Sequence, residues 1–288
     1  MTPDRRKGML IVAFGAILFA PDSLMLRLMA MEQWPTLFWR GLVGGGAITL
    51  VFLAIHRGGY LSRIRALGRA GVVFALLFSA TSICFVYAVR ETSVANTLFL
   101  VSTSPVFSAL ISWFALGERP DRRTIRTTAI ALAGVGLIAT GAGGEGGPNS
   151  LLGDLAALGA SAALAASFVA ARSVRPLDMT PMIGPAGLLS AAVAALLAGD
   201  FAIRDGALWP LLAMGLLIMP LATICLTVGP RYITAPEVSL LMLIEAALGP
   251  LIVWWALGED PGWRTLVGGA VILGALLLSA LEERRTAQ

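Results

Sequence analysis

The chain has 288 residues, of which 57% are hydrophobic and 13% are charged, with a formal net charge of +4. Soluble domains carry about a quarter charged residues, so this composition excludes an ordinary water-soluble globule and a disordered chain. Lys7 is the only lysine, and two cysteines are too few for a disulfide framework. Neither a nucleic-acid partner nor a metal or other cofactor is expected.

Apolar runs long enough to cross a membrane recur along the whole sequence. A helix needs about 20 residues to cross roughly 30 Å of hydrocarbon. This measure predicts an all-α integral membrane protein with ten transmembrane helices over residues 8–30, 35–55, 70–89, 94–116, 123–141, 151–171, 180–199, 207–229, 234–257 and 263–281. The connections are short, so any function must be built from the helices themselves.

The distribution of basic residues indicates how these helices are oriented. With the N-terminus inside, only Arg27, Arg90, Arg204 and Arg264 fall in outer connections, whereas most other Arg residues lie on the inner side. Inner loops are enriched in Lys and Arg. We therefore expect a multi-pass membrane protein with both termini cytoplasmic. The further expectations are a location in a bacterial inner membrane, contact with lipid, and a monomer or a weak homodimer.

Ionisable residues inside the first two predicted helices are candidates for a substrate site, because buried charge is costly in a membrane and usually faces a cavity or a partner. Asp22 follows Pro21, which lacks a backbone N–H and is a candidate kink. It also lies near enough to the outer surface to be merely solvated. Arg40 could hold a substrate carboxylate, pair with an acid, or extend toward the interface.

The third and fourth predicted helices add hydroxyl and aromatic side chains, and Pro105 is a second candidate kink. These side chains could form the wall of a weakly polar, aromatic pocket, or they could join helices to one another. The candidates for this wall, including two aromatic residues from other helices, are Trp39, Ser82, Tyr87, Asn96, Ser102, Ser104 and Phe168.

Glu245 lies near the middle of the ninth predicted helix, five residues before a third candidate kink at Pro250. Its carboxylate could bind a substrate ammonium group or a proton, or it could be a structural group bonded to neighbouring helices. The only histidine is His56, at the end of a helix and without a partner at metal-ligand spacing. A metal site and an enzymatic activity are therefore not expected.

The two halves of the sequence repeat each other. A shift of 141 residues aligns 79–140 with 220–281 and pairs scarce residues, among them Cys84 with Cys225 and Trp113 with Trp254. The run Ala-Leu-Gly-Glu occurs in both halves, ending at Glu118 and Glu259. Five helices in each half place the second copy in the opposite orientation. We predict two inverted repeats, 1–145 and 146–288, around a central cavity.

These motifs resemble the drug/metabolite transporter superfamily, EamA type, over essentially the whole chain. The resemblance is carried by Thr103-Ser104-Pro105-Val106-Phe107 through Leu116-Gly117-Glu118, by Leu243-Ile244-Glu245 through Leu257-Gly258-Glu259, and by Arg40 in Phe38-Trp39-Arg40. The family commonly has Glu-Pro where this chain has Glu245-Ala246. The proline of the family pattern would kink the helix, and this chain departs from that pattern.

The resemblance implies a secondary transporter of small organic solutes that works by alternating access. Its branches that export amino acids, including aromatic ones, are the most similar, so the expected partner is an amino acid or a related metabolite, and the expected role is that of an exporter or uniporter. Two alternatives stay open, a passive channel and a membrane-embedded enzyme that modifies lipids. A channel would call for filter loops or charged rings, and an enzyme for a clustered nucleophile, base or metal.

Overall fold

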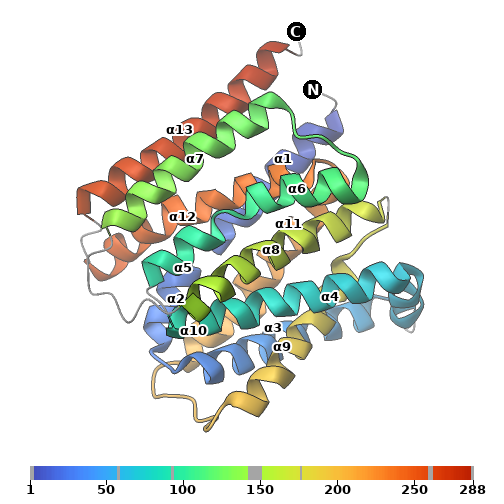
Figure 1. The fold of residues 1–288 in the computed structure, drawn as a ribbon. Helices are drawn as coiled ribbons and strands as arrows, with labels where there is room; N and C mark the ends of the chain where they lie inside the picture. The colour runs from blue at the N-terminus through green and yellow to red at the C-terminus, as the bar shows by residue number, and fades with distance from the viewer. Residues whose placement is uncertain are drawn as a thin grey trace.

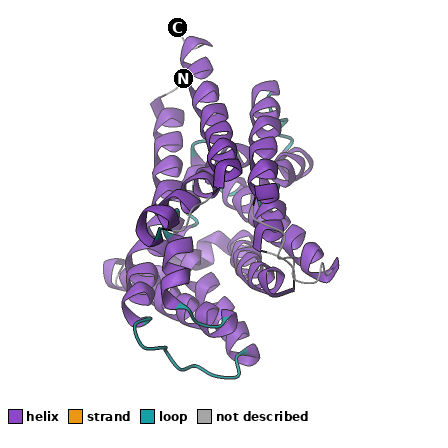
Figure 2. Cartoon of the chain, turned by 90° about the vertical axis from the view of Figure 1, so that its left-hand side faces the viewer, coloured by secondary structure: helices purple, strands orange, loops and turns teal. Residues whose placement is uncertain are grey.

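The computed structural model describes residues 3–56, 59–91, 94–141, 151–175, 177–258 and 262–286, and the regular elements in these ranges are all helical (Figure 2). The first half contains α1 (Pro3–Phe19), α2 (Asp22–Met29), α3 (Gln33–His56), α4 (Tyr60–Glu91), α5 (Val94–Val101), α6 (Ser104–Leu116) and α7 (Arg122–Gly141). The second half contains α8 (Leu151–Ser173), η1 (Thr180–Met182), α9 (Ile183–Leu197), α10 (Leu208–Ala213), η2 (Met214–Ile218), α11 (Met219–Val228), η3 (Gly229–Arg231), α12 (Ala235–Leu257) and α13 (Gly262–Thr286).

Nine helical segments within the described ranges are long and apolar enough to cross a membrane. The remaining predicted span is α7, whose first turns carry Arg122, Arg123 and Arg126 and are therefore less apolar. It lies alongside α13 (Figure 1). The prediction of an all-helical, multi-pass membrane protein is confirmed.

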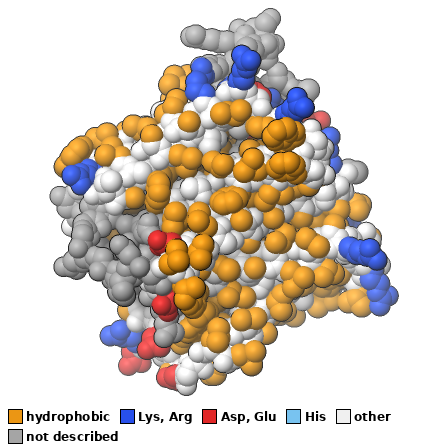
Figure 3. All heavy atoms as spheres, viewed as in Figure 1, with side chains coloured by type: hydrophobic (Ala, Val, Ile, Leu, Met, Phe, Trp, Pro, Cys, Tyr) orange, Lys and Arg blue, Asp and Glu red, His pale blue; other side chains and the backbone are white. Residues whose placement is uncertain are grey.

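The outer surface of the helices is the surface that hydrocarbon would cover. Large apolar side chains stand exposed on it, such as Trp255 and Leu196, with 86% and 85% of their areas accessible. In Figure 3 apolar side chains cover most of the visible face, and Lys and Arg gather along its top and right edge. The described ends of α1 and α13 lie at the same end of the molecule (Figure 1). We call this end the termini side.

Helix packing reflects the repeat. Three helices of the first half pack against their own counterparts in the second half, giving the pairs α3 with α9, α6 with α12, and α7 with α13. The contact of α4 with α8 recurs with the halves exchanged as the contact of α11 with α1. The chain thus folds as two inverted five-helix repeats, as the sequence predicts.

The repeated Ala-Leu-Gly-Glu motif ends a helix in both halves. Gly117 closes α6 at φ 70° and Gly258 closes α12 at φ 72°. Both values lie in the left-handed region, which a glycine adopts without the steric cost of a side chain. The motif is therefore a helix stop, and the first copy delivers Glu118 to the termini side directly after the turn.

Glycines also set the closest helix contacts between the repeats. A Cβ atom on Gly45 of α3 would lie 2.8 Å from the Leu188 backbone nitrogen and 2.9 Å from the Gly184 carbonyl oxygen of α9. A Cβ atom on Gly134 of α7 would lie 2.8 Å from the carbonyl oxygen of Gly268 on α13. Small residues at these crossings let the backbones approach each other, as is common between membrane helices.

Two of the three predicted kink positions lie at breaks. The regular α-helix is interrupted by a turn between α1 and α2 at Ala20 and Pro21, and by another between α5 and α6 just before Pro105. Pro105 cannot donate to the Val101 carbonyl, and the hydroxyl of Ser161 on α8 donates to that oxygen instead, at 3.1 Å. By contrast, α12 runs without interruption through both Ala246 and Pro250.

The span that contains α10 and α11 is irregular in a different way. Its middle, η2, is a π-helical turn over Met214–Ile218, and Pro220 follows within the next turn. A proline ring crowds the carbonyl four residues earlier and cannot donate to it, so the wider turn accommodates Pro220. Gly215 in this turn lies against Val43 and Gly44 of α3.

Candidate functional site

The structure brings three of the predicted residues together from three different helices. Asp22 is the first residue of α2, directly after the break at Pro21. Arg40 lies in the second turn of α3, and Glu245 lies in the middle of α12. The break between α1 and α2 places the carboxylate at the start of a new helix, where it faces α3. These residues form the charged cluster.

Arg40 and Asp22 form a hydrogen-bonded ion pair in the cluster. The Arg40 Nη2 donates to Asp22 Oδ1 at 3.0 Å, and it also donates to the Met219 Sδ of α11 at 3.4 Å. Asp22 is 8% exposed, and the Arg40 side chain is 15% exposed. A charge-assisted bond between groups shielded from water is stronger than a neutral one.

Glu245 is the third member of the cluster, and it is near enough to interact electrostatically with both Asp22 and Arg40. Within the described ranges no residue forms a hydrogen bond or ion pair with its side chain. The cluster then holds two carboxyl groups and one guanidinium. If all three are charged, one negative charge is left without a partner.

The surroundings of the charged cluster are rich in methionine. Met25 and Met29 of α2 and Met214 of η2 pack in one core group, with Trp39 and Met219 at its margin. Trp39 also donates from Nε1 to the Phe201 carbonyl at 3.0 Å. Methionine is flexible and polarizable and adapts to ligands of different shape, so this wall could accommodate varied apolar groups.

The other predicted wall residues lie apart from the charged cluster or are bonded locally. Ser82 and Ser102 donate to carbonyls of their own helices, those of Phe78 at 3.5 Å and Leu98 at 2.7 Å. Ser104 is buried at the start of α6, and Phe168 is buried in a core group with Val12. The side chain of Asn96 lies outside the described part of the structure.

Tyr87 lines a crevice of about 480 Å³ at the end of the molecule opposite the termini side. Its other lining residues are Trp34, Ile83, Cys84, Glu91, Ala156 and Leu197, from α3, α4, α8 and α9. Both repeats thus contribute to it. Its volume is in the range of small-molecule sites.

Sequence reasoning missed Met219 and Arg172. Met219 accepts from Arg40, and a methionine in an apolar helix carries no sign of such a role. Arg172 donates from Nε to the carboxylate of Glu118 at 2.7 Å. The sequence does carry a signal for Arg172, because an arginine near the end of a helix of small residues is conspicuous.

Comparison with known proteins identifies the family. Residues 6–140 and 151–281 each match the EamA-like transporter family, and together these matches cover most of the chain. The chain belongs to the EamA-like transporter family. The resemblance seen in the sequence motifs is confirmed, and this EamA-like protein is a membrane transporter, with a small-molecule solute as its partner.

Two relatives of this EamA-like transporter are known as uncharacterized transporters. One, YetK of Bacillus subtilis (strain 168), is 26% identical in an alignment of 161 residues that covers 52% of this chain and 47% of that protein. This match thus spans about half of the Bacillus protein. The other, from Archaeoglobus fulgidus, is 26% identical in an alignment of 248 residues that covers 82% of this chain and 88% of that protein.

A solved structure supports the fold of this EamA-like transporter. A protein crystal structure superposes with a TM-score of 0.80 at 19% identity, covering 98% of this chain and 99% of that one. Identity this low is evidence for the fold alone.

In the described ranges, no group of three or more His, Cys, Asp or Glu side chains could hold a metal ion.

Proposed function

We propose that this protein is a secondary transporter of small organic solutes, above all neutral or aromatic amino acids, which it moves across a bacterial inner membrane by alternating access as an exporter or uniporter. The observation that carries the proposal is the charged cluster, in which Glu245 lies beside the Asp22–Arg40 pair and has no bonding partner among the described residues. Both termini would be cytoplasmic, and 1–145 and 146–288 would be the two moving halves.

The cluster offers a binding partner for each charged group of a zwitterionic amino acid. The substrate ammonium group would pair with Glu245, and its carboxylate would share the Arg40 guanidinium with Asp22. Arginine binds carboxylates through a planar fork of donors. The methionine-rich wall around Trp39 would then receive the side chain of the amino acid.

Alternating access would come from helices that bend where the chain is already interrupted. The breaks before Asp22 and Ser104 and the π-helical turn η2 are such places. Inverted repeats allow one half to rock against the other around a fixed site. The sequence carries no ATP-binding motif, so the gradient of the solute or of a coupled ion would drive transport. The protein would not act as an enzyme.

A reconstituted flux assay tests this proposal. Purified protein in liposomes is expected to take up at least one neutral or aromatic amino acid with saturation and counterflow, and unlabelled competitors would rank the solutes. Flux that rises linearly with concentration and lacks counterflow would identify a channel instead. If no amino acid is taken up or competes, the substrate class proposed here is wrong.

A further inference from the structure

Two ion pairs join separate parts of the chain at the termini side. In the first, Arg172 at the end of α8 donates from Nε to both carboxylate oxygens of Glu118, at 3.0 and 2.7 Å. The same guanidinium donates from Nη1 to the carbonyl oxygens of Pro230, at 3.0 Å, and Ile233, at 2.8 Å. Arg172 therefore holds the end of α6 from the first repeat against the start of α12 from the second.

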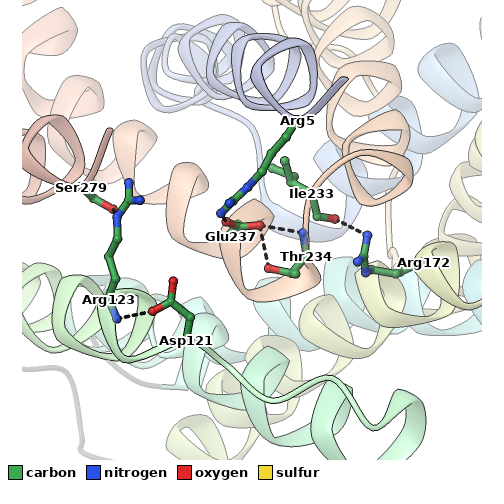
Figure 4. Close-up of polar contacts among 8 residues, drawn as sticks. All are labelled: Arg5, Asp121, Arg123, Arg172, Ile233, Thr234, Glu237 and Ser279. Carbon is green, nitrogen blue, oxygen red and sulfur yellow. Dashed lines mark hydrogen bonds and ion pairs between the residues drawn. The ribbon is translucent and has the colours of Figure 1, made fainter. Parts of the chain in front are cut away.

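The second ion pair joins Arg5 of α1 to Glu237 of α12 (Figure 4). Glu237 also accepts from the backbone nitrogen and the hydroxyl of Thr234, both at 2.8 Å, which completes the cap of α12. This pair too links the first repeat to the second. Beside it Arg123 of α7 donates to Ser279 of α13 at 3.0 Å.

The pocket among these residues is small. It is bounded by Arg5, Arg123, Glu237 and their neighbours and has a volume of about 30 Å³, which leaves room for no more than a few water molecules. The crevice at the opposite end holds about 480 Å³. Of these two pockets, the one among the ion pairs on the termini side is therefore by far the smaller.

One helix, α12, connects these ion pairs to the charged cluster. Glu237 and Glu245 lie eight residues apart on α12, which is unbroken between them. That separation is about 12 Å at 1.5 Å per residue. Movement of the first turn of α12 would therefore move Glu245 with it.

We propose that the pairs Glu118–Arg172 and Arg5–Glu237 form the gate that closes the transporter on the termini side, with Arg172 and Glu237 acting as positioning residues for Glu245 through α12. The proposal rests on the transport function proposed above. Opening toward the termini side would require both pairs to separate, which would free the start of α12 to swing away from α1 and α6.

Thiol labelling of a buried reporter tests the gate. Ser239, fully buried and two residues beyond Glu237 on α12, becomes the reporter as Ser239→Cys in a chain carrying Cys84→Ala and Cys225→Ala. A membrane-impermeant maleimide is applied to vesicles in which the protein's termini face the outside. Removal of a C-terminal tag by added protease verifies this orientation. Glu118→Gln and Arg5→Gln are expected to raise the labelling rate about tenfold, in the range of typical conformational couplings.

Two matched variants control for the loss of charge itself. Arg5→Lys keeps the pair with Glu237 and should label as slowly as the parent. Asp178→Asn removes a carboxylate that accepts from the Thr180 backbone within the second repeat, and it should also label slowly. Arg5→Gln leaves the cap of α12 intact, so this variant is expected to fold.

The proposal is overturned if Glu118→Gln and Arg5→Gln label at the parental rate, or if Asp178→Asn accelerates labelling as much as they do. The assay contains no solute, so its result does not depend on which solute is carried. An absence of amino-acid uptake would overturn the substrate proposal and leave the gate standing.

Discussion

The guanidinium of Arg40 on α3 donates to the carboxylate of Asp22 on α2 over 3.0 Å. This bond closes a distance of eighteen residues in sequence, and it forms because the first span ends and restarts just before Asp22. The pair leaves Glu245 as the carboxyl group of the cluster with no bonding partner in the described structure. The predictions for Glu245 and for the Asp22–Arg40 pair follow from this excess of carboxyl groups over guanidinium groups.

The first prediction concerns Glu245. Glu245→Gln keeps the size of the side chain but removes its charge, so solute flux in liposomes is expected to fall at least about tenfold, the order expected for losing a charge-assisted bond. Expression and melting temperature should stay near those of the parent. Glu32→Gln, at an exposed position between α2 and α3, serves as the control. If Glu245→Gln transports like the parent at every pH, Glu245 has no part in the mechanism.

The second prediction concerns the Asp22–Arg40 pair. Arg40→Leu leaves two carboxyl groups without a cation and is expected to cost about 3–5 kcal/mol of stability, as for other broken buried pairs. Asp22→Leu together with Arg40→Leu removes the whole pair and should recover much of that loss. Thermal melting in detergent measures both. A stability loss in the double variant equal to the sum of the losses in Arg40→Leu alone and Asp22→Leu alone would contradict the pairing.

The third prediction concerns the crossing of α3 and α9. Gly45→Val would push a side chain into the backbone of Leu188 and Gly184, and overpacking of this kind costs about 1–3 kcal/mol. Gly46→Val is the matched control, because a Cβ atom there meets nothing within 4 Å. Equal melting temperatures for the two variants would show that the close approach is not needed.

The fourth prediction concerns the break before Pro105. Ser161→Ala removes the donor to the Val101 carbonyl and is expected to lower stability by about 0.6 kcal/mol, the average for bonds between membrane helices, and by no more than about 1.7 kcal/mol. Ser173→Ala removes a hydroxyl that donates to Ala170 in its own helix and should have a smaller effect. Comparable losses in both variants would show that the bond across the break contributes nothing special.

The fifth prediction concerns orientation. Reporter fusions at residues 1 and 288 are both expected to be active in the cytoplasm, because the basic residues gather at the end where α1 begins and α13 ends (Figure 3). Alkaline phosphatase, which is active only outside, should be silent at both ends. Alkaline phosphatase activity from a fusion at residue 288 would overturn the count of ten helices.

The sequence was sufficient to predict the helices, the repeat and the charged residues of the cluster. Length and hydropathy determine which segments can cross a membrane, and the cost of burying charge singles out Asp22, Arg40 and Glu245. That these three meet depends on how α2, α3 and α12 pack, which no local pattern encodes. Phe168 illustrates the limit, since an aromatic residue in an apolar helix looks the same whether it faces a cavity or, as here, a core.

The breaks and widened turns within the helices could not be predicted from the sequence either. Prolines mark where a backbone bond must be lost, but the response differs: the chain breaks before Pro105, widens before Pro220 and continues through Pro250. Which response occurs depends on neighbours, such as the Ser161 hydroxyl that bonds the freed carbonyl of Val101. A single sequence does not show those neighbours.

The wide turn at Met214–Ile218 has an effect on the residue that follows it. A π-helical turn holds an extra residue compared with an α-helical one, so everything after it is rotated relative to an ordinary helix. Met219, the first residue beyond this turn, is thereby aimed at Arg40. Shortening the segment by one residue would restore regular winding and rotate that sulfur by about 100°, leaving the arginine without its soft acceptor.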